Sequence, residues 1–255
     1  MSRMTDEFKT GTPRSPTRRR AIALAGAALL VPSMAQARLG TSRVLRVPHH
    51  GRQQFGQKSY AETLPLAEGE VILTFDDGPV PGLTDRVLSL LEAENTRATF
   101  FLIGRNAAAH PHLVRRMISN GHTVANHTMT HPWTMRNISH ERALADIEAG
   151  ERAIVQAAGQ GIAPFFRFPG FADTPCLLEH LANTNRAVFG ADLWASDWNT
   201  MAPGAQLQLV MSRLRRQRRG ILLFHDTRPQ TVAMLPDFLA SLKRENFRVV
   251  HTVPA

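Results

Sequence analysis

Short apolar runs alternate with longer amphipathic stretches from Val71 to the C-terminus. The apolar runs cover residues 71–75, 98–102, 122–126, 165–168, 187–189, 221–224 and 247–251. Helical patterns lie between them, over residues 138–158 and 231–245 and in the i, i+3, i+4, i+7 spacing of Leu207, Val210, Met211 and Leu214. This alternation predicts parallel strands joined by crossover helices. About seven such units favour a closed or nearly closed α/β barrel, in which chemistry gathers at the C-terminal ends of the strands.

The beginning of the chain has the order of parts that is typical of a secretory signal. Three arginines at 18–20 precede an apolar run at 21–31, and residues 35–37 offer small side chains for cleavage. The run of 11 residues is shorter than the roughly 20 that span a bilayer, so we expect no stable membrane span after cleavage. Thr17-Arg18-Arg19 leaves a twin-arginine signal open beside the general secretory route. The sequence thus predicts a signal peptide over residues 1–37 and an exported protein, periplasmic or secreted.

The remaining chain divides into an expected irregular leader, residues 38–69, and a main domain, residues 70–255. Without the signal, 30−6=24 basic and 21−2=19 acidic side chains remain, a net charge of +5. This mild charge suits solubility and an anionic cell envelope, and no nucleic-acid partner is predicted. The single cysteine, Cys176, lies beside two leucines and cannot form an internal disulfide. We expect it to be buried and inert.

Polar side chains follow the first two apolar runs that carry candidate chemistry. Asp76 and Asp77 come directly after the run at 71–75, before Gly-Pro forces a turn. Two adjacent carboxylates repel each other unless a positive group lies beside them. His127 and His131, four residues apart, follow the run at 122–126 and can face one cation. One aspartate with two histidines suits a divalent ion with open positions for water; zinc is expected first, and other divalent metals stay open.

Later strand ends carry further polar groups. Arg167 lies near the end of the run at 165–168, Asp192 and Asp197 follow the run at 187–189, and His225 follows the run at 221–224. Because parallel strands present their C-terminal ends at one rim, we expect these side chains to converge there.

At this point the sequence resembles the polysaccharide deacetylases of carbohydrate esterase family 4, the NodB homology domain. The resemblance covers the chain from about Val71 onward, with five motifs in the family's order: Thr74–Gly78, His127–His131, Arg167–Pro169, Asp197-Trp198 and Leu223–His225. It implies a distorted (β/α)7 barrel, in agreement with the alternation of runs, and makes residues 70–255 the catalytic domain.

The resemblance also implies a role for each matched residue. The implied metal ligands are Asp77, His127 and His131. The implied acid–base groups are Asp76 as general base and His225 as general acid, with Arg167 pairing with Asp76 and Asp197 orienting His225. The implied substrate contacts are Leu223 and Trp198 at an acetyl pocket and the backbone N–H of Gly170 toward the oxyanion.

Two motifs depart from the family's pattern. The third usually continues with a tyrosine where Gly170 stands, so an aromatic wall of the groove is missing, and Phe171 is a candidate replacement. The fourth usually has an aspartate where Trp194 stands, and Asp192 lies two positions earlier. Both departures concern substrate contacts.

The predicted function is a metal-dependent hydrolase that removes acetyl groups from N-acetylated sugars of a polysaccharide such as peptidoglycan, a chitin-like polymer or an exopolysaccharide. Two alternatives stay open: an inactive glycan-binding protein of the same fold, and a hydrolase of small amides or O-acetyl esters. An amide is a poor electrophile and its amine a poor leaving group, so a general base and a general acid are both needed.

Overall fold

The central strand of the sheet is β3 (Glu70–Asp76), which is buried along its whole length. The computed structural model describes residues 38–255, and the predicted export signal over residues 1–37 lies outside the described residues. The ladder runs β8-β9-β3-β4-β5-β6-β7-β2, and β10 joins β3 at its first residues and carries β1 on its other side. Every pairing in this sheet is parallel.

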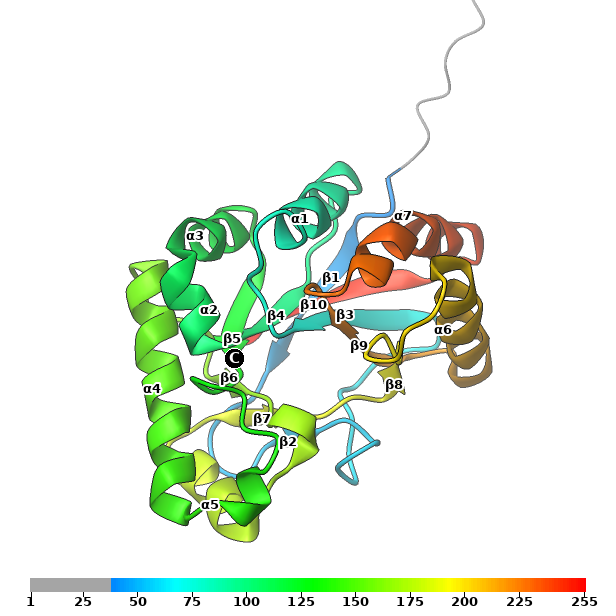
Figure 1. Cartoon of the computed structure of the whole chain (residues 1–255). Helices are drawn as coiled ribbons and strands as arrows, with labels where there is room; N and C mark the ends of the chain where they lie inside the picture. The colour runs from blue at the N-terminus through cyan, green and yellow to red at the C-terminus, as the bar shows by residue number, and fades with distance from the viewer. Residues whose placement is uncertain (1–37) are drawn as a thin grey trace, which may run out of the picture. The chain divides into compact units, whose positions relative to one another are not determined.

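The strands have the following bounds: β1 Thr41–Val47, β2 Gln54–Phe55, β3 Glu70–Asp76, β4 Thr99–Leu102, β5 Thr123–Asn126, β6 Phe165–Phe166, β7 Ala187–Phe189, β8 Leu193–Trp194, β9 Gly220–His225 and β10 Arg248–Pro254. The helices are α1 Thr84–Ala93, α2 Gly104–Ala109, α3 Pro111–Ser119, α4 His140–Ala158, α5 Pro175–Asn183, α6 Pro203–Gln217 and α7 Pro229–Arg244. Figure 1 shows these helices around the outside of the strands.

Seven strands, β3 to β9, form the predicted distorted barrel. Strand β7 leads through residues 190–192 into β8, which pairs with β9 and so brings the chain back to β3. No ladder joins β7 to β8 within residues 38–255, and this opening is where the barrel departs from a regular one. The predicted α/β barrel is confirmed, as are the helices expected over residues 138–158 and 231–245 and around Leu207–Leu214.

Period-two alternation along β3 decides which side chains enter the barrel. Val71, Leu73 and Phe75 belong to the large apolar cluster that also contains residues of the surrounding helices. Ile72 belongs to a separate cluster of side chains drawn mostly from the strands. Asp76 lies four residues after Ile72, so it has the same direction and points into the barrel.

Three expectations are corrected by the structure. Residues 38–69 are not irregular throughout, because β1 pairs with β10 and β2 pairs with β7. The run at 247–251 is a strand, β10, but the seventh strand of the barrel is the two-residue β8, which the pattern did not reveal. Cys176 is exposed, because it lies in the first turn of α5 while Leu177 faces the core.

Among the described helices, none combines the length and the apolar character that crossing a membrane requires.

Candidate functional site

Two consecutive carboxylates, Asp76 and Asp77, approach the same imidazole at the end of β3. One oxygen of each lies near Nε2 of His127, at 3.8 Å for Asp76 and 3.6 Å for Asp77. In a regular strand they would point to opposite faces, but Asp77 has a φ of 77° and so leaves the strand geometry. The next residue, Gly78, cannot carry a side chain, because a Cβ there would lie 2.3 Å from the carboxylate of Asp226. The turn after β3 therefore brings both acids to one place.

The predicted metal ligands Asp77, His127 and His131 lie together, although 50 residues separate the first two. One ligand atom from each lies within 4.8 Å of the other two. Oδ1 of Asp77 is 3.2 Å from Nε2 of His131, and it is buried without a hydrogen-bond partner in the described chain. A buried carboxylate oxygen without a donor is costly unless a cation binds it.

The imidazoles of His127 and His131 are neutral, which is the protonation state that binds metals. Nδ1 of His127 lies 2.7 Å from the carbonyl oxygen of Arg167 and donates to it, which leaves the lone pair of Nε2 toward Asp77. Burial lowers the pKa of His127 to about 3, so this ring is neutral at pH 7. Burial also lowers the pKa of His131, against the opposing effect of Asp77. Two neutral imidazoles and one carboxylate fit a divalent ion with open positions.

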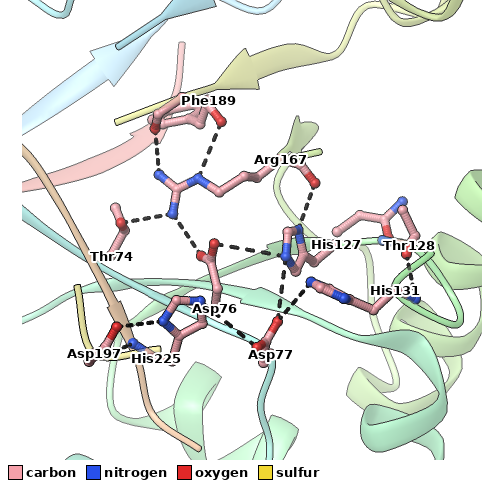
Figure 2. A network of polar contacts seen from close by, with 12 residues as sticks. Thr74, Asp76, Asp77, His127, Thr128, His131, Arg167, Phe189, Asp197 and His225 are labelled. Atoms are coloured by element: carbon pink, nitrogen blue, oxygen red, sulfur yellow. Dashed lines mark hydrogen bonds and ion pairs between the residues drawn. The ribbon is translucent and has the colours of Figure 1, made fainter. Parts of the chain in front are cut away.

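Asp76 is held by Arg167, which fills the interior of the barrel below the ligands. Nη1 of Arg167 donates to Oδ1 of Asp76 at 2.7 Å and to Oγ1 of Thr74 at 2.9 Å. Its other nitrogens donate to the carbonyl oxygens of Phe189 at 3.2 Å and Gly190 at 2.7 Å. Burial raises the pKa of Asp76, and the guanidinium opposes this increase. The pair thus keeps a buried carboxylate aimed at the site (Figure 2).

His225 lies on the neighbouring strand β9 in register with Asp76. Its Nδ1 is 2.7 Å from Oδ1 of Asp197, and its backbone N–H donates to Oδ2 of the same carboxylate at 2.7 Å. Burial alone would lower the pKa of His225, but the hydrogen bond and charge of Asp197, with those of Asp77 and Asp76, raise it to about 9. The ring is therefore protonated at pH 7 and presents Nε2 toward the ligand group, 3.9 Å from Asp77.

A cavity of about 390 Å³ opens above these groups. Its charged and titratable lining comes from Asp76, His127, His131, His225 and Arg228. The predicted substrate contacts Gly170, Trp198 and Leu223 line the same cavity. All ten residues expected at the site therefore lie in the cavity or directly support a group that does.

The aromatic lining of the cavity differs from the expectation. Trp133 covers Gly170, because a Cβ built on that glycine would lie 3.1 Å from the indole ring. Phe171 also lines the cavity and stacks on Trp194, with ring centres 6.2 Å apart and planes 15° apart. The wall beside Gly170 is thus a tryptophan from the loop after His131, with 63 % of its surface exposed.

Asp192 is not part of this cavity. Its carboxylate accepts from the backbone N–H groups of Gln57 and Ile221, both at 2.8 Å, and from the hydroxyl of Thr63 at 2.5 Å. It ties the segment before β3 to β9, which is a structural role.

Two supporting groups carry no local sequence signal. The hydroxyl of Thr231 donates to Oδ2 of Asp197 at 2.7 Å and is itself contacted by Nε2 of Gln206 at 3.0 Å. Asp226 accepts from Oγ1 of Thr84 at 2.6 Å behind the turn that carries Asp77. Burial raises the pKa of Asp226 to about 7. Only the position of Asp226 next to His225 could have drawn attention to it from sequence.

Comparisons with known proteins find similarity to polysaccharide deacetylases. Residues 64–185 match the family model described as polysaccharide deacetylase. A chitooligosaccharide deacetylase of Bradyrhizobium sp. is 35% identical over 199 residues, which cover 72% of this chain and 89% of that protein. A peptidoglycan-N-acetylglucosamine deacetylase of Bacillus cereus is 33% identical over 196 residues, covering 73% and 88%. The solved structure of a Bdellovibrio bacteriovorus peptidoglycan deacetylase superposes with a TM-score of 0.78 at 26% identity, covering 87% of this chain and 61% of that one.

The fold and these similarities define a hydrolytic enzyme that acts on carbohydrates. The chain belongs to the polysaccharide deacetylase family, which confirms the family and the enzyme class predicted from the five motifs.

Proposed function

We propose that this protein hydrolyses the acetamido group of N-acetylated sugars within a polysaccharide and that it needs a divalent metal ion for this reaction. One observation carries the proposal: Asp76 and His225 flank the group formed by Asp77, His127 and His131 at one cavity. Base, acid and cation ligands in contact with one space suit hydrolysis of a single carbonyl group.

The ion would be held by Asp77, His127 and His131, and zinc is our first choice because two imidazoles and one carboxylate are common zinc ligands. When bound, it supplies Lewis acidity toward the acetyl carbonyl and activates water. Asp76 takes the proton of the attacking water, and Arg167 opposes the rise in the pKa of that carboxyl group that burial causes and holds it toward the cavity.

His225 gives its proton to the departing amine. Its pKa of about 9, which Asp197 sustains against burial, keeps the acid loaded at neutral pH. Gly170, Leu223 and Trp198 line the cavity. The backbone N–H of Gly170 would donate to the oxyanion, and Leu223 and Trp198 would enclose the acetyl methyl group. Trp198 is 39 % exposed, so it can also meet the sugar ring.

The two alternative functions are weaker. A protein that only binds glycan has no need for a buried ion pair with costly desolvation, such as Asp76 with Arg167. An ester has a better leaving group than an amide and has less need of a protonated His225. We propose further that the protein is exported, periplasmic or secreted, on the basis of the signal pattern in residues 1–37.

The test is acetate release by the full-length protein from N-acetylglucosamine oligomers and from peptidoglycan, before and after treatment with a chelator. We expect release that stops on metal removal and returns when a divalent ion is added. Turnover that survives complete metal removal would contradict the metal mechanism. Glycan binding without acetate release under any divalent metal would favour the binding protein.

A further inference from the structure

Arg228 lines the same cavity as the proposed catalytic groups but takes no part in their network. It follows the end of β9 by three residues, and its backbone N–H donates to the carbonyl oxygen of His225 at 3.3 Å. This turn fixes the arginine close to the histidine that is proposed to protonate the departing amine. The side chain of Arg228 is partly exposed.

The guanidinium of Arg228 has no partner within residues 38–255. It makes no side-chain hydrogen bond and no ion pair, and its Nε is buried without an acceptor. The other arginines near the cavity are occupied: Arg167 binds Asp76, and Arg213 donates to the carbonyl oxygen of Trp194 at 2.6 Å. A donor that is withdrawn from water without an acceptor costs about 1–3 kcal/mol. Such a group is available to a ligand that supplies acceptors.

The surroundings of Arg228 favour a negatively charged ligand. Among residues 38–255, Asp76 is the only acidic residue that lines the cavity, and its charge is engaged by Arg167. A second cation, the exposed Lys58, has its Nζ 5.5 Å from the ring centre of Trp194, which also lines the cavity. Nε1 of Trp194 is a further buried donor, for which the described part of the chain offers no acceptor.

We propose that Arg228 binds a carboxylate carried by the glycan near the acetamido group that is hydrolysed, so that the substrate class is an anionic N-acetylated glycan rather than a neutral one. This inference rests on the proposed function and adds the choice of substrate. A guanidinium binds a carboxylate through two parallel hydrogen bonds, which gives both energy and orientation. Chains of N-acetylglucosamine alone have no such group, whereas peptidoglycan strands freed of their stem peptides carry a lactyl carboxylate on alternate sugars.

Three substrates separate charge from shape in the test. They are a tetramer of N-acetylglucosamine, a peptidoglycan tetrasaccharide with free lactyl carboxylates, and the same tetrasaccharide with its carboxylates converted to amides. The full-length, metal-loaded protein is compared with Arg228→Gln and with Arg216→Gln, an exposed arginine of α6 outside the cavity that changes the net charge equally. Thermal unfolding checks that both variants are folded.

We expect kcat/KM for the carboxylated tetrasaccharide to exceed that for the amidated form by about 10- to 100-fold, the range that charged hydrogen bonds give. Arg228→Gln should remove most of this ratio, and Arg216→Gln should leave it as in the unaltered protein. Equal rates on the two tetrasaccharides, or equal losses on all three substrates in Arg228→Gln, would overturn the inference.

Calorimetric affinities for the two tetrasaccharides give a second readout that does not need turnover. If no substrate releases acetate but the carboxylated tetrasaccharide binds more tightly in an Arg228-dependent way, the proposed function fails and the inference stands. If acetate is released but neither rate nor affinity depends on the carboxylate, the inference fails and the proposed function stands.

Discussion

The two adjacent aspartates provide the sharpest test of the site, because the proposal gives them different roles. Asp76→Asn preserves the shape of the side chain but removes its charge and its ability to take a proton. Since a positioned general base contributes typically about 10²–10⁴-fold, we expect acetate release to fall by that factor. The metal content should stay close to one ion per chain, because Asp76 bonds Arg167 at 2.7 Å and is not one of the three ligands.

The same substitution should have a measurable cost in stability. Arg167 would lose one charge-assisted hydrogen bond, worth about 1.5–3 kcal/mol, while its bonds to Thr74, Phe189 and Gly190 remain. Relief from burying the carboxylate offsets part of this loss. We therefore expect a loss near 2 kcal/mol in the free energy of unfolding, or a thermal midpoint lower by roughly 4–8 °C at about 2–4 °C per kcal/mol.

Asp77→Asn is the matched control. Oδ1 of Asp77 lies 3.2 Å and 3.6 Å from the two imidazole nitrogens, so this variant should lose metal on dialysis and regain part of its activity when excess ion is added. Metal analysis and acetate release are measured on both variants. An Asp76→Asn protein that loses its metal, beside an Asp77→Asn protein that keeps it, would mean that the two roles are exchanged. Acetate release near the unaltered rate in Asp76→Asn would end its assignment as the base.

Three further outcomes are expected. With His225 as the acid, kcat/KM should fall as the pH rises through about 9; Asp197→Asn should move this fall to lower pH, and an unmoved profile would refute the pairing. Gly170→Ala should lower kcat/KM and displace Trp133, because the glycine has a φ of 54° and its Cβ would lie 3.1 Å from the ring; a variant with unaltered kinetics and tryptophan fluorescence would contradict this packing. Burial lowers the pKa of His122 to about 3 from an unfolded value near 6.5, so its contribution to stability is full above about pH 6.5 and is lost as the pH falls toward 3. The free energy of unfolding in urea should therefore depend less steeply on pH in His122→Gln than in the unaltered protein, by up to about 1.4 kcal/mol per pH unit. An equal pH dependence in the two proteins would contradict this reasoning.

The sequence predicted the fold well where one simple pattern of apolar residues marks an element. Strand β3 is buried on both faces, and its run from Val71 to Phe75 is continuous in apolar character up to the acids. Strand β1 was missed because it lies at an edge, where exposed positions such as Arg46 alternate with partly buried ones such as Leu45. Strand β8 has only two residues, Leu193 and Trp194, too few to show any period.

The site was predictable to the extent that its residues end strands. Asp76 and His225 are neighbours because β3 and β9 are paired in register. In a parallel barrel the C-terminal ends of all strands lie at one rim, so residues at those ends converge. The replacement of the missing wall by Trp133 depends instead on how a loop folds over Gly170. The lack of a partner for Arg228 among residues 38–255 is likewise a property of the folded chain, which cannot be derived from sequence spacing.

The two buried aspartates of the fourth motif region show why role follows from partners rather than from burial. Asp192 and Asp197 are both almost fully buried, at 1 % and 0 % exposure. The donors to Asp192 are two backbone amides and a hydroxyl, none of which changes charge near neutral pH, so this carboxylate can only fix the chain. Asp197 instead meets the ring of His225, whose proton it stabilises. The absence of an aspartate at Trp194 therefore leaves the proposed acid–base groups Asp76 and His225 complete. Its consequence falls on the part of the cavity wall formed by Trp194, next to Lys58, where we propose that substrates are distinguished.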